Sequence, residues 1–247
     1  MIVSRQNAIV KHLKALADKK ERRKTQTYIV EGEKSVAAAI DSGADVVLVL
    51  CTEDQADKYI SRGVKVEIAE KHIVDYCADS VTPQGVIAEV RCCQSVALTG
   101  GNAVLLDGIS DPGNLGTIIR TCAAVGVKDI LLVGCADVYS PKCVRSSMSG
   151  IFFVNPIVCD AVQALKAVED KTLLVADMGG ENVFSSVFDG FCKEFCLVIG
   201  NEAHGVSEGF LSHADKVVSI PMNPQMESLN AGVSCAVILY RLLNEKL

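Results

Sequence analysis

From Ala103 onward, continuous apolar runs alternate with segments of helical periodicity, and this alternation constrains the fold more than any other feature of the sequence. The runs are AVLLDG, DILLVG, FFVNPIV, TLLVAD, FCLVIG and KVVSIPM, and the last helical segment is SLNAGVSCAVILYRLL, 228–243. Strands that are apolar on both faces are typical of a parallel sheet with helices on both sides. The sequence therefore predicts an α/β fold for this part.

The first 91 residues show a shorter alternation of the same kind. An amphipathic helix, with Ser4 as its candidate N-cap, leads into the basic run KKERRK, and TYIVEGE, DVVLVLC, VKVEIA and GVIAEVR are the expected strands. The segment CCQSVALTGGN breaks the pattern, and its Gly100-Gly101 pair is typical of a linker. We therefore expect a small α/β domain over 1–91, a linker over 92–102 and a second domain over 103–247.

Composition narrows the class of protein. The longest apolar runs are far shorter than the roughly 20 residues that span a bilayer, and the first residues contain no apolar signal core, which together predict a cytoplasmic protein. The 11 cysteines include no CxxC pair, although Cys192 and Cys196 lie close in sequence, and the four histidines lie in no metal-binding pattern with them. We expect free thiols and no metal site.

Charge is distributed unevenly along the chain. The formal net charge is −6, yet residues 1–34 hold nine Lys and Arg against four Asp and Glu, so they carry +5 and the rest carries −11. Clustered basic residues such as Arg22 and Arg23 suit RNA phosphates. A solvated helix face would show the same pattern, so charge alone leaves both interpretations open.

Three loops with many polar and glycine residues follow predicted strands of the second domain: DGISDPGNLG, 107–116, GNEAHGVS, 200–207, and PMNPQMESLN, 221–230. Parallel strands end at one sheet edge, where ligands bind. Taken singly, each loop has a structural explanation: Asn114, Ser228 and Asn230 are possible helix caps, and Arg120 is a possible surface charge. Together they place Arg, Glu, Ser and Asn side chains at one edge.

The segments DPGNLGTIIRTCAAVG, LVIGNEAHGVS and IPMNPQMESLNAGVSCAVILY resemble, in order, the three signature motifs of the SpoU-type RNA ribose 2'-O-methyltransferases of the SPOUT class. The first domain, with YIVEGEKSV and TPQGVIAEV, is similar to the L30e-like RNA-binding domain that precedes many such enzymes. The resemblance implies a deep trefoil knot, S-adenosylmethionine as cofactor, an RNA partner and a homodimer formed through the knotted domain.

By motif position, the resemblance also implies site residues. The reacting set would be Asn114, Arg120, Glu202, Ser228 and Asn230, and the cofactor would lie against the backbone of Gly200, Ile220 and Leu229. Glycine suits position 200 if the backbone approaches a ligand closely. The segment SPKCVRSSMSG, 140–150, resembles a family element beside the RNA, which adds Lys142 and Arg145 to Arg22 and Arg23 as expected RNA contacts.

In this family the arginine at position 120 is proposed as the base that takes the proton of the ribose hydroxyl. Keeping a guanidinium neutral at pH 7 costs roughly 7 to 9 kcal/mol. A cationic Arg120 that clamps an RNA phosphate and stabilises the developing oxyanion is therefore the favoured role. Glu202 would orient Arg120 or Asn230, while Ser228 and Asn230 would position the ribose oxygen.

Two other function classes compete with this interpretation. One is an RNA-binding protein on the same scaffold that has lost catalysis, although Arg120, Glu202 and Asn230 are all present. The other is a nucleotide-dependent oxidoreductase, which the lack of a GxGxxG motif disfavours. The extra N-terminal domain favours ribosomal RNA of the large subunit over tRNA as the substrate, because it suggests reach to a structured element.

Overall fold

The computed structural model describes residues 1–247 except 94, 96, 192 and 244–247. Contacts divide the chain into two compact units, which we call unit 1 (1–92 with 139–152) and unit 2 (93–138 with 153–247). Residues 94 and 96 of the predicted linker, and Cys192, lie outside the described residues. The segment 139–152 groups with unit 1, a grouping that the boundaries expected from sequence do not include.

Unit 1 is built on a mixed sheet with the order β1-β4-β2-β3, in which only the β2–β3 pair is parallel. Apolar side chains of α1 and α5 cover one face, and those of α3, α4 and α7 cover the other. The strands are β1 (Thr27–Glu31), β2 (Val46–Cys51), β3 (Val66–Ile68) and β4 (Val86–Arg91); the helices are α1 (Ala8–Ala15), α2 (Lys19–Thr25), α3 (Glu33–Asp41), α4 (Glu53–Ile60), α5 (Lys71–Cys77) and α7 (Pro141–Ser146).

The basic N-terminal segment forms two helices and not one. Asn7, not the expected Ser4, caps α1, because its side chain accepts a hydrogen bond from the backbone N–H of Ile9. Asp18 caps α2 by accepting from the N–H of Lys20. The Asp18 cap gives the chain a local reason to restart the helix at residue 19.

Arg22, which we expected to contact RNA, is buried inside unit 1. Its residue surface is only 5 % exposed, and its Nη1 donates to the carbonyl oxygens of Leu16, 2.7 Å, and Ala17, 2.8 Å. These carbonyls end α1, where backbone acceptors lack partners within the helix. The guanidinium thus ties α2 to the end of α1, so we remove Arg22 from the RNA contacts and keep the exposed Arg23.

Arg22→Ala should destabilise the protein by about 2 kcal/mol, because it leaves buried carbonyl acceptors without a charged donor. Arg23→Ala, on the exposed side of the same helix, should change the free energy of unfolding by less than about 0.5 kcal/mol. Urea unfolding followed by circular dichroism measures both values. Equal stability of the two variants would contradict the structural role of Arg22.

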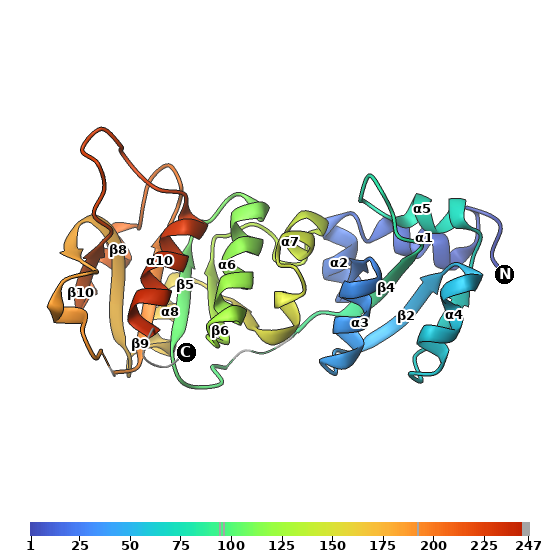
Figure 1. Cartoon of the computed structure of the whole chain (residues 1–247), viewed down its shortest axis with the longest axis horizontal. Helices are drawn as coiled ribbons and strands as arrows, with labels where there is room; N and C mark the ends of the chain where they lie inside the picture. The colour runs from blue at the N-terminus through green and yellow to red at the C-terminus, as the bar shows by residue number, and fades with distance from the viewer. Residues whose placement is uncertain (94, 96, 192, 244–247) are drawn as a thin grey trace. The chain divides into compact units, whose positions relative to one another are not determined.

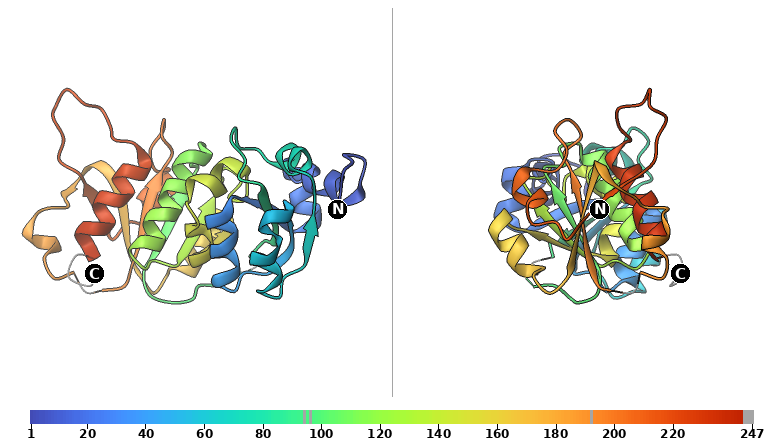
Figure 2. Two further views of the ribbon diagram at one scale, coloured as in Figure 1. Left: turned by 45° about the vertical axis from the view of Figure 1, so that its right-hand side comes forward. Right: turned by 90° about the vertical axis from the view of Figure 1, so that its left-hand side faces the viewer.

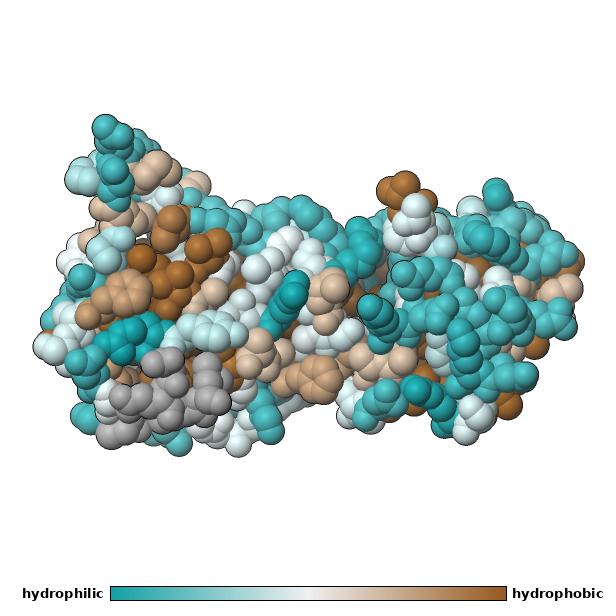
Figure 3. All heavy atoms as spheres, viewed as in Figure 1, coloured by the Kyte–Doolittle hydropathy of each residue, from teal (hydrophilic) through white to brown (hydrophobic). Residues whose placement is uncertain are grey.

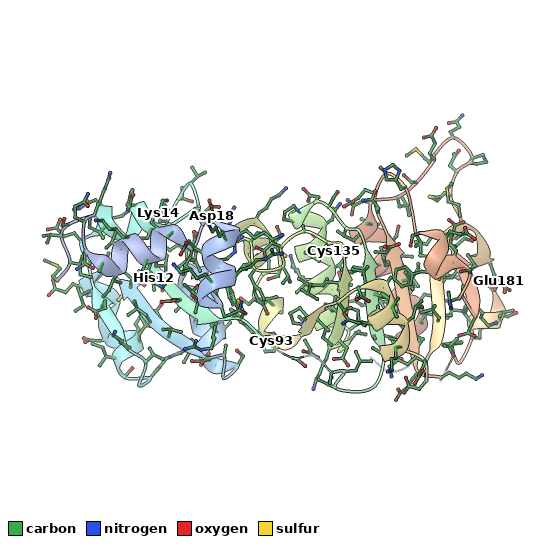
Figure 4. All side chains as sticks on the ribbon, turned by 180° about the vertical axis from the view of Figure 1, so that it is seen from behind. His12, Lys14, Asp18, Cys93, Cys135 and Glu181 are labelled. Atoms are coloured by element: carbon green, nitrogen blue, oxygen red, sulfur yellow. The ribbon has the colours of Figure 1, made fainter. Side chains whose placement is uncertain are left out.

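A buried carboxylate lies in the sheet of unit 1. Glu89, on β4, accepts hydrogen bonds from the Thr27 hydroxyl at 2.7 Å and contacts His12 Nε2 at 2.7 Å. Figure 4 shows His12 on α1. Glu89 is 5 % exposed, so these two partners supply the polar contacts that a buried carboxylate needs. We assign this histidine a structural role.

Unit 2 contains a six-stranded sheet with the order β10-β8-β9-β5-β6-β7, and all of its pairings are parallel. The α/β fold class predicted from sequence is therefore confirmed. Helices α6 and α10 pack side by side, while α8 lies on the opposite face of the sheet (Figures 1 and 2). Strands that are buried on both faces explain the continuous apolar runs in this part of the sequence.

The strands of unit 2 are β5 (Ala103–Asp107), β6 (Asp129–Val133), β7 (Asn155–Val158), β8 (Thr172–Asn182), β9 (Phe195–Gly200) and β10 (Lys216–Ser219). Its helices are α6 (Pro112–Ala124), α8 (Ala161–Ala167), α9 (Glu208–Leu211), α10 (Ala231–Leu243) and the 3-10 turn η2 (Ser186–Phe188). The run FFVNPIV, expected as one strand, begins in the 3-10 turn η1 (Gly150–Phe153), and only its second half pairs with β6.

Two negative findings concern the described part of the chain. None of its helices is long and apolar enough to cross a membrane. Within the same residues, no group of three or more His, Cys, Asp and Glu side chains could hold a metal ion.

Candidate functional site

Two of the three polar loops are joined at the carboxyl ends of β5 and β9. These strands are neighbours, and Asp107 at the end of β5 lies opposite Gly200 at the end of β9. The Asn201 amide donates to the Gly108 carbonyl at 2.7 Å, and the Asp107 carboxylate accepts from the Ser207 N–H at 2.7 Å. These bonds fix one loop against the other at the sheet edge where ligands bind in such folds.

A chain of hydrogen bonds links four polar residues from all three loops. Asn114 Nδ2 donates to Glu202 Oε1 at 2.8 Å, and Asn230 Nδ2 donates to Asn114 Oδ1 at 2.8 Å. On the other side, Glu202 Oε2 accepts from the N–H of Ser110 at 3.3 Å and from its hydroxyl at 3.2 Å. Three of the five predicted reacting residues thus meet in one network.

Helix caps explain how Asn114 and Asn230 reach this network. Asp111 caps α6 by accepting from the backbone N–H of Asn114, so the Asn114 side chain is not needed as the cap. Asn230 both caps the start of α10 and joins the network. Its Oδ1 accepts from the N–H of Gly232 at 2.9 Å, and its Nδ2 donates to Asn114. The helix start therefore fixes the amide of Asn230 with its donor directed at the site.

The network keeps Glu202 ionised. Burial raises the pKa of Glu202, but hydrogen bonds from Asn114, the backbone and Ser110 outweigh it, and the net shift lowers the pKa below its usual value. Hydrogen bonds to a carboxylate favour its charged form. The site therefore contains a fixed negative charge at neutral pH.

Arg120 and Ser228, the other two predicted reacting residues, lie outside the hydrogen-bond network. Arg120 is exposed on α6, and it forms no hydrogen bond or ion pair with any other described residue. Ser228 is exposed and lines the cavity described next. Among the described residues, no group therefore occupies the donors of Arg120, which are available to a ligand.

A cavity of about 480 Å³ adjoins the network within unit 2. Its walls include all three residues predicted to contact the cofactor, which are Gly200, Ile220 and Leu229. Further apolar side chains, Ile199 and Ile238, contribute to the same walls. A cavity with apolar walls and a few polar groups is typical of small-molecule sites.

The same cavity also carries acidic side chains, Glu202, Glu227 and Asp177. S-adenosylmethionine combines a flat adenine, which suits apolar walls, with a positively charged sulfonium and an amino group, which suit carboxylates. The residues present therefore fit this cofactor.

Gly200 is required by the chain itself. A Cβ at position 200 would lie 2.2 Å from the carbonyl carbon of Gly205 and from the backbone nitrogen of Val206. Residues 201–205 form a tight turn, closed by two bonds between the backbones of Asn201 and Gly205, both of 2.9 Å. From the sequence, a glycine is expected here because a ligand approaches the backbone, whereas the structure shows close approach of the following turn.

The three remaining RNA-contact candidates lie in unit 1. Arg23 and Lys142 are exposed on α2 and α7. Arg145, also on α7, forms an ion pair with Asp79. This pair occupies part of the Arg145 guanidinium, so Arg145 is a less available phosphate contact than Arg23.

Sequence reasoning missed Ser110, Asn201 and Asp107, which hold the predicted residues in place. Ser110 and Asn201 are common polar residues in loops and Asp107 ends β5, and only the register of β5 and β9 brings them together. Their position directly after apolar strands was the available signal, but it does not reveal which loop each side chain binds.

Comparisons with known proteins identify the family of the chain. Residues 101–240 match the model of the SpoU rRNA methylase family, and residues 7–88 match an MRM3-like substrate-binding domain. The chain is 32 % identical over 247 residues to the 23S rRNA (guanosine(2553)-2'-O)-methyltransferase RlmP of Bacillus subtilis, covering 98 % of both proteins.

Two solved structures extend the similarity to the whole fold. An AdoMet-bound rRNA methyltransferase from Sinorhizobium meliloti has a TM-score of 0.89 at 26 % identity and covers 100 % of this chain and 98 % of its own. The SpoU methyltransferase AviRb from Streptomyces viridochromogenes, in complex with AdoMet, has a TM-score of 0.85 at 27 % identity, with 98 % of both chains covered.

These matches confirm the family and the cofactor class expected from the three motifs. They cover both the catalytic region and the unit that precedes it. The chain belongs to the SpoU rRNA methylase family, and is an rRNA methyltransferase with an N-terminal substrate-binding domain.

Proposed function

We propose that this protein transfers a methyl group from S-adenosylmethionine to a ribose 2'-hydroxyl of large-subunit ribosomal RNA. The observation that carries the proposal is the Ser110–Glu202–Asn114–Asn230 network beside the 480 Å³ cavity. The relatives support the substrate, because the named enzymes from Bacillus subtilis and Streptomyces act on 23S rRNA at 2'-O positions. The N-terminal substrate-binding domain favours ribosomal RNA over tRNA, because an extra domain suggests reach to a structured element.

The reaction needs help at the ribose oxygen, because a hydroxyl is a weak nucleophile at neutral pH. Gly200, Ile220 and Leu229 would hold S-adenosylmethionine, which would supply the activated methyl group and leave as S-adenosylhomocysteine, while the proton of the ribose hydroxyl would pass to water. Arg120, which is free of partners in the described chain, clamps an RNA phosphate and stabilises the negative charge that develops on the attacking oxygen. Ser228 and Asn230 position that oxygen, and Glu202 holds Asn230 in place through Asn114.

Ser110 is a positioning residue for Glu202, and its removal is a test of the network. Ser110→Ala removes one donor from Oε2, so the pKa of Glu202 should rise back toward its usual value. If the ionised form is the active one, activity is lost as pH falls through this pKa, and the acid limb of the pH–rate profile moves to higher pH in the variant. At neutral pH Glu202 stays ionised in the variant, so the rate reduction of about 5-fold that we expect there comes from the lost hydrogen bond that positions Glu202.

Ser110→Thr keeps the hydroxyl and is the matched control, which should restore both the rate and the position of the acid limb. A purely structural role for Ser110 would lower the melting temperature without moving the acid limb. An unchanged pH profile in Ser110→Ala would contradict the assigned role.

Unit 1 would hold the RNA. We propose a substrate-binding domain over 1–91, a linker over 92–102 and the methyltransferase domain over 103–247, with Arg23, Lys142 and Arg145 as phosphate contacts. The three side chains are exposed in unit 1, as phosphate binding requires. Because ribosomal RNA is the substrate, the protein would act where ribosomes are assembled, in the cytoplasm.

We further propose that the protein is a homodimer formed through the knotted C-terminal domain. On α10, Val233 and Tyr240 are 47 % and 50 % exposed, and their spacing of seven residues puts them on one face of the helix. Figure 3 shows apolar surface over this helix. Light scattering should give twice the mass of one chain, and Tyr240→Glu should give the mass of a single chain.

The decisive experiment is calorimetric binding of S-adenosylmethionine, followed by methyl transfer to ribosomal RNA. The activity would be established if S-adenosylmethionine binds and its labelled methyl group appears on one ribose of the RNA, with the chain at that nucleotide then resistant to alkaline cleavage. Cofactor binding without transfer to ribosomal RNA but with transfer to tRNA would correct the substrate. No cofactor binding in the presence or absence of RNA would favour the RNA-binding protein that lacks catalysis.

A further inference from the structure

Two cations lie on one aromatic ring of unit 1, outside the residues assigned to methyl transfer. The Cζ of Arg5 is 4.5 Å from the centre of the Tyr76 ring, and the Nζ of Lys14 is 5.1 Å from it. The two charges are therefore no more than about 10 Å apart, which is the Debye length at 0.1 M salt, so their fields add. We call Arg5, Lys14 and Tyr76 the cationic cluster; Figure 4 shows Lys14 on α1.

The cationic cluster has hydrogen-bond donors that the described chain does not use. Arg5 is exposed, and it makes no hydrogen bond or ion pair with another described residue. Lys14 Nζ donates one long bond, of 3.5 Å, to the carbonyl oxygen of Ala78. A contact with the face of a ring holds a cation by its charge and leaves its N–H groups for an acceptor. The cluster can therefore donate to a ligand while the ring holds it in place.

Carboxylates do not neutralise the cationic cluster. In the part of the chain that the structure describes, no acidic side chain forms an ion pair with Arg5 or Lys14, and the exposed Lys11, one turn earlier on α1, is unpaired as well. The acidic residues near the cluster in sequence have partners of their own: Asp18 caps α2, Glu70 pairs with His72, Asp75 pairs with Lys71, and Asp79 pairs with Arg145. Neighbouring positive charges repel each other, and a bound anion relieves this repulsion.

The fold holds the cationic cluster in one arrangement. Before Arg5, the backbone of Ile2 forms a bridge with Ala69, next to β3. After Arg5, Asn7 caps α1. The ring of Tyr76 comes from α5, which packs against α1. Because the cluster is ordered before any ligand arrives, a ligand loses less entropy on binding to it.

We propose that Arg5 and Lys14, oriented by Tyr76, bind the phosphate backbone of the substrate RNA. Both the charge and the unused N–H donors suit phosphate oxygens. Such contacts fix the position of an RNA without reading its sequence. That the anion is RNA rests on the proposed function. The cluster adds a contact surface on α1 and α5 to the phosphate contacts proposed on α2 and α7.

The salt dependence of RNA binding tests the cationic cluster, because each phosphate contact releases counterions. The full chain is titrated with protein-free ribosomal RNA in filter-binding assays at several NaCl concentrations. In the double variant Arg5→Ala, Lys14→Ala, the affinity at 0.1 M salt should fall about 10-fold, and the slope of log affinity against log salt should become shallower by about 2. An affinity and a slope equal to those of the wild type would overturn the proposal.

Arg62→Ala is the matched control for Arg5→Ala. Arg62 is also an exposed arginine of unit 1, but it pairs with Asp41 at 3.0 Å. Its replacement should change the slope by less than about 0.5, whereas Arg5→Ala alone should change it by about 1. Equal changes in the two variants would show a general effect of net charge and would overturn the assignment to this cluster.

Tyr76→Leu tests whether the ring orients the two cations. Leucine keeps an apolar side chain against the core of unit 1 but removes the ring, so the affinity for RNA should fall about 3-fold with the slope unchanged. Tyr76→Phe keeps the ring and should bind as the wild type does. Thermal unfolding of both variants is measured, and the charge variants decide if Tyr76→Leu does not fold. Unchanged affinity in folded Tyr76→Leu would overturn the orienting role of the ring.

Methyl transfer in the same samples separates the cationic cluster from the proposed function. The double variant should raise the KM for RNA about 10-fold and leave kcat within about twofold, because it removes binding that is equal in the ground and transition states. Methyl transfer by the wild type, with unchanged RNA binding in the double variant, overturns the cluster alone. Weaker RNA binding in the double variant, without methyl transfer by the wild type, overturns the proposed function alone.

Discussion

Arg120→Lys should lower methyl transfer about 100-fold while the affinity for S-adenosylmethionine stays unchanged. Lysine keeps the charge but loses the planar fork that grips two oxygens of a phosphate. Arg120 is exposed and has no partner within the described chain, so the substitution disturbs no internal contact. The loss would therefore report on the contact with RNA and on the attacking oxygen, and not on folding. Single-turnover methyl transfer and calorimetry measure the two quantities.

Arg91→Lys is the matched control for Arg120→Lys. Arg91 is also an exposed arginine, and it pairs with Asp45 at 2.8 Å in unit 1, so its replacement should leave methyl transfer within about twofold. Near-normal activity of Arg120→Lys would contradict both the clamp and the base, because both require the guanidinium. A strong loss of affinity for S-adenosylmethionine in Arg120→Lys would instead show that Arg120 contacts the cofactor and not the RNA.

The motifs predicted which residues share the site, but not how they are connected. Asn114, Glu202 and Asn230 come from three separate loops. The bond between Asn114 and Glu202 follows from the parallel order of β5 and β9, and the bond between Asn230 and Asn114 follows from the packing of α10 against α6. That order could be expected from apolar runs and helices in alternation. Ser110 could not be found in the same way, because its role depends on the direction of one hydroxyl in a loop.

The basic N-terminal segment shows where a charge pattern misleads. Arg22 and Arg23 are adjacent and chemically identical, yet one is buried on the carbonyls of Leu16 and Ala17 and the other is exposed. The difference arises from the break between α1 and α2, where Asp18 caps the start of α2. The amino-acid composition gives the number of positive charges, but the break between α1 and α2 determines that Arg23, and not Arg22, remains available to a phosphate.

Gly200 connects the fold of unit 2 to its chemistry. Its missing side chain lets the turn 201–205 fold back onto the end of β9, with Gly205 and Val206 in contact with position 200. The same turn carries Glu202, and Asn201 ties it to Gly108 after β5. The carboxylate of Glu202 therefore reaches Asn114 only if the turn 201–205 is closed. Because closure of the turn requires glycine at position 200, the hydrogen-bond network depends on that glycine as well.

Gly200→Ala should accordingly destabilise the protein by about 3 kcal/mol, because a Cβ 2.2 Å from the backbone forces the turn to move and cannot be relieved by a side-chain rotation. It should also abolish binding of S-adenosylmethionine, since position 200 lines the cavity and the displaced turn carries Glu202. Gly209→Ala, in the short helix α9, is the matched control. A Cβ there meets nothing closer than 4.0 Å, so stability should change by less than about 1 kcal/mol. Denaturant unfolding and calorimetry measure both effects, and equal stability of the two variants would show that the turn tolerates the side chain that this structure excludes.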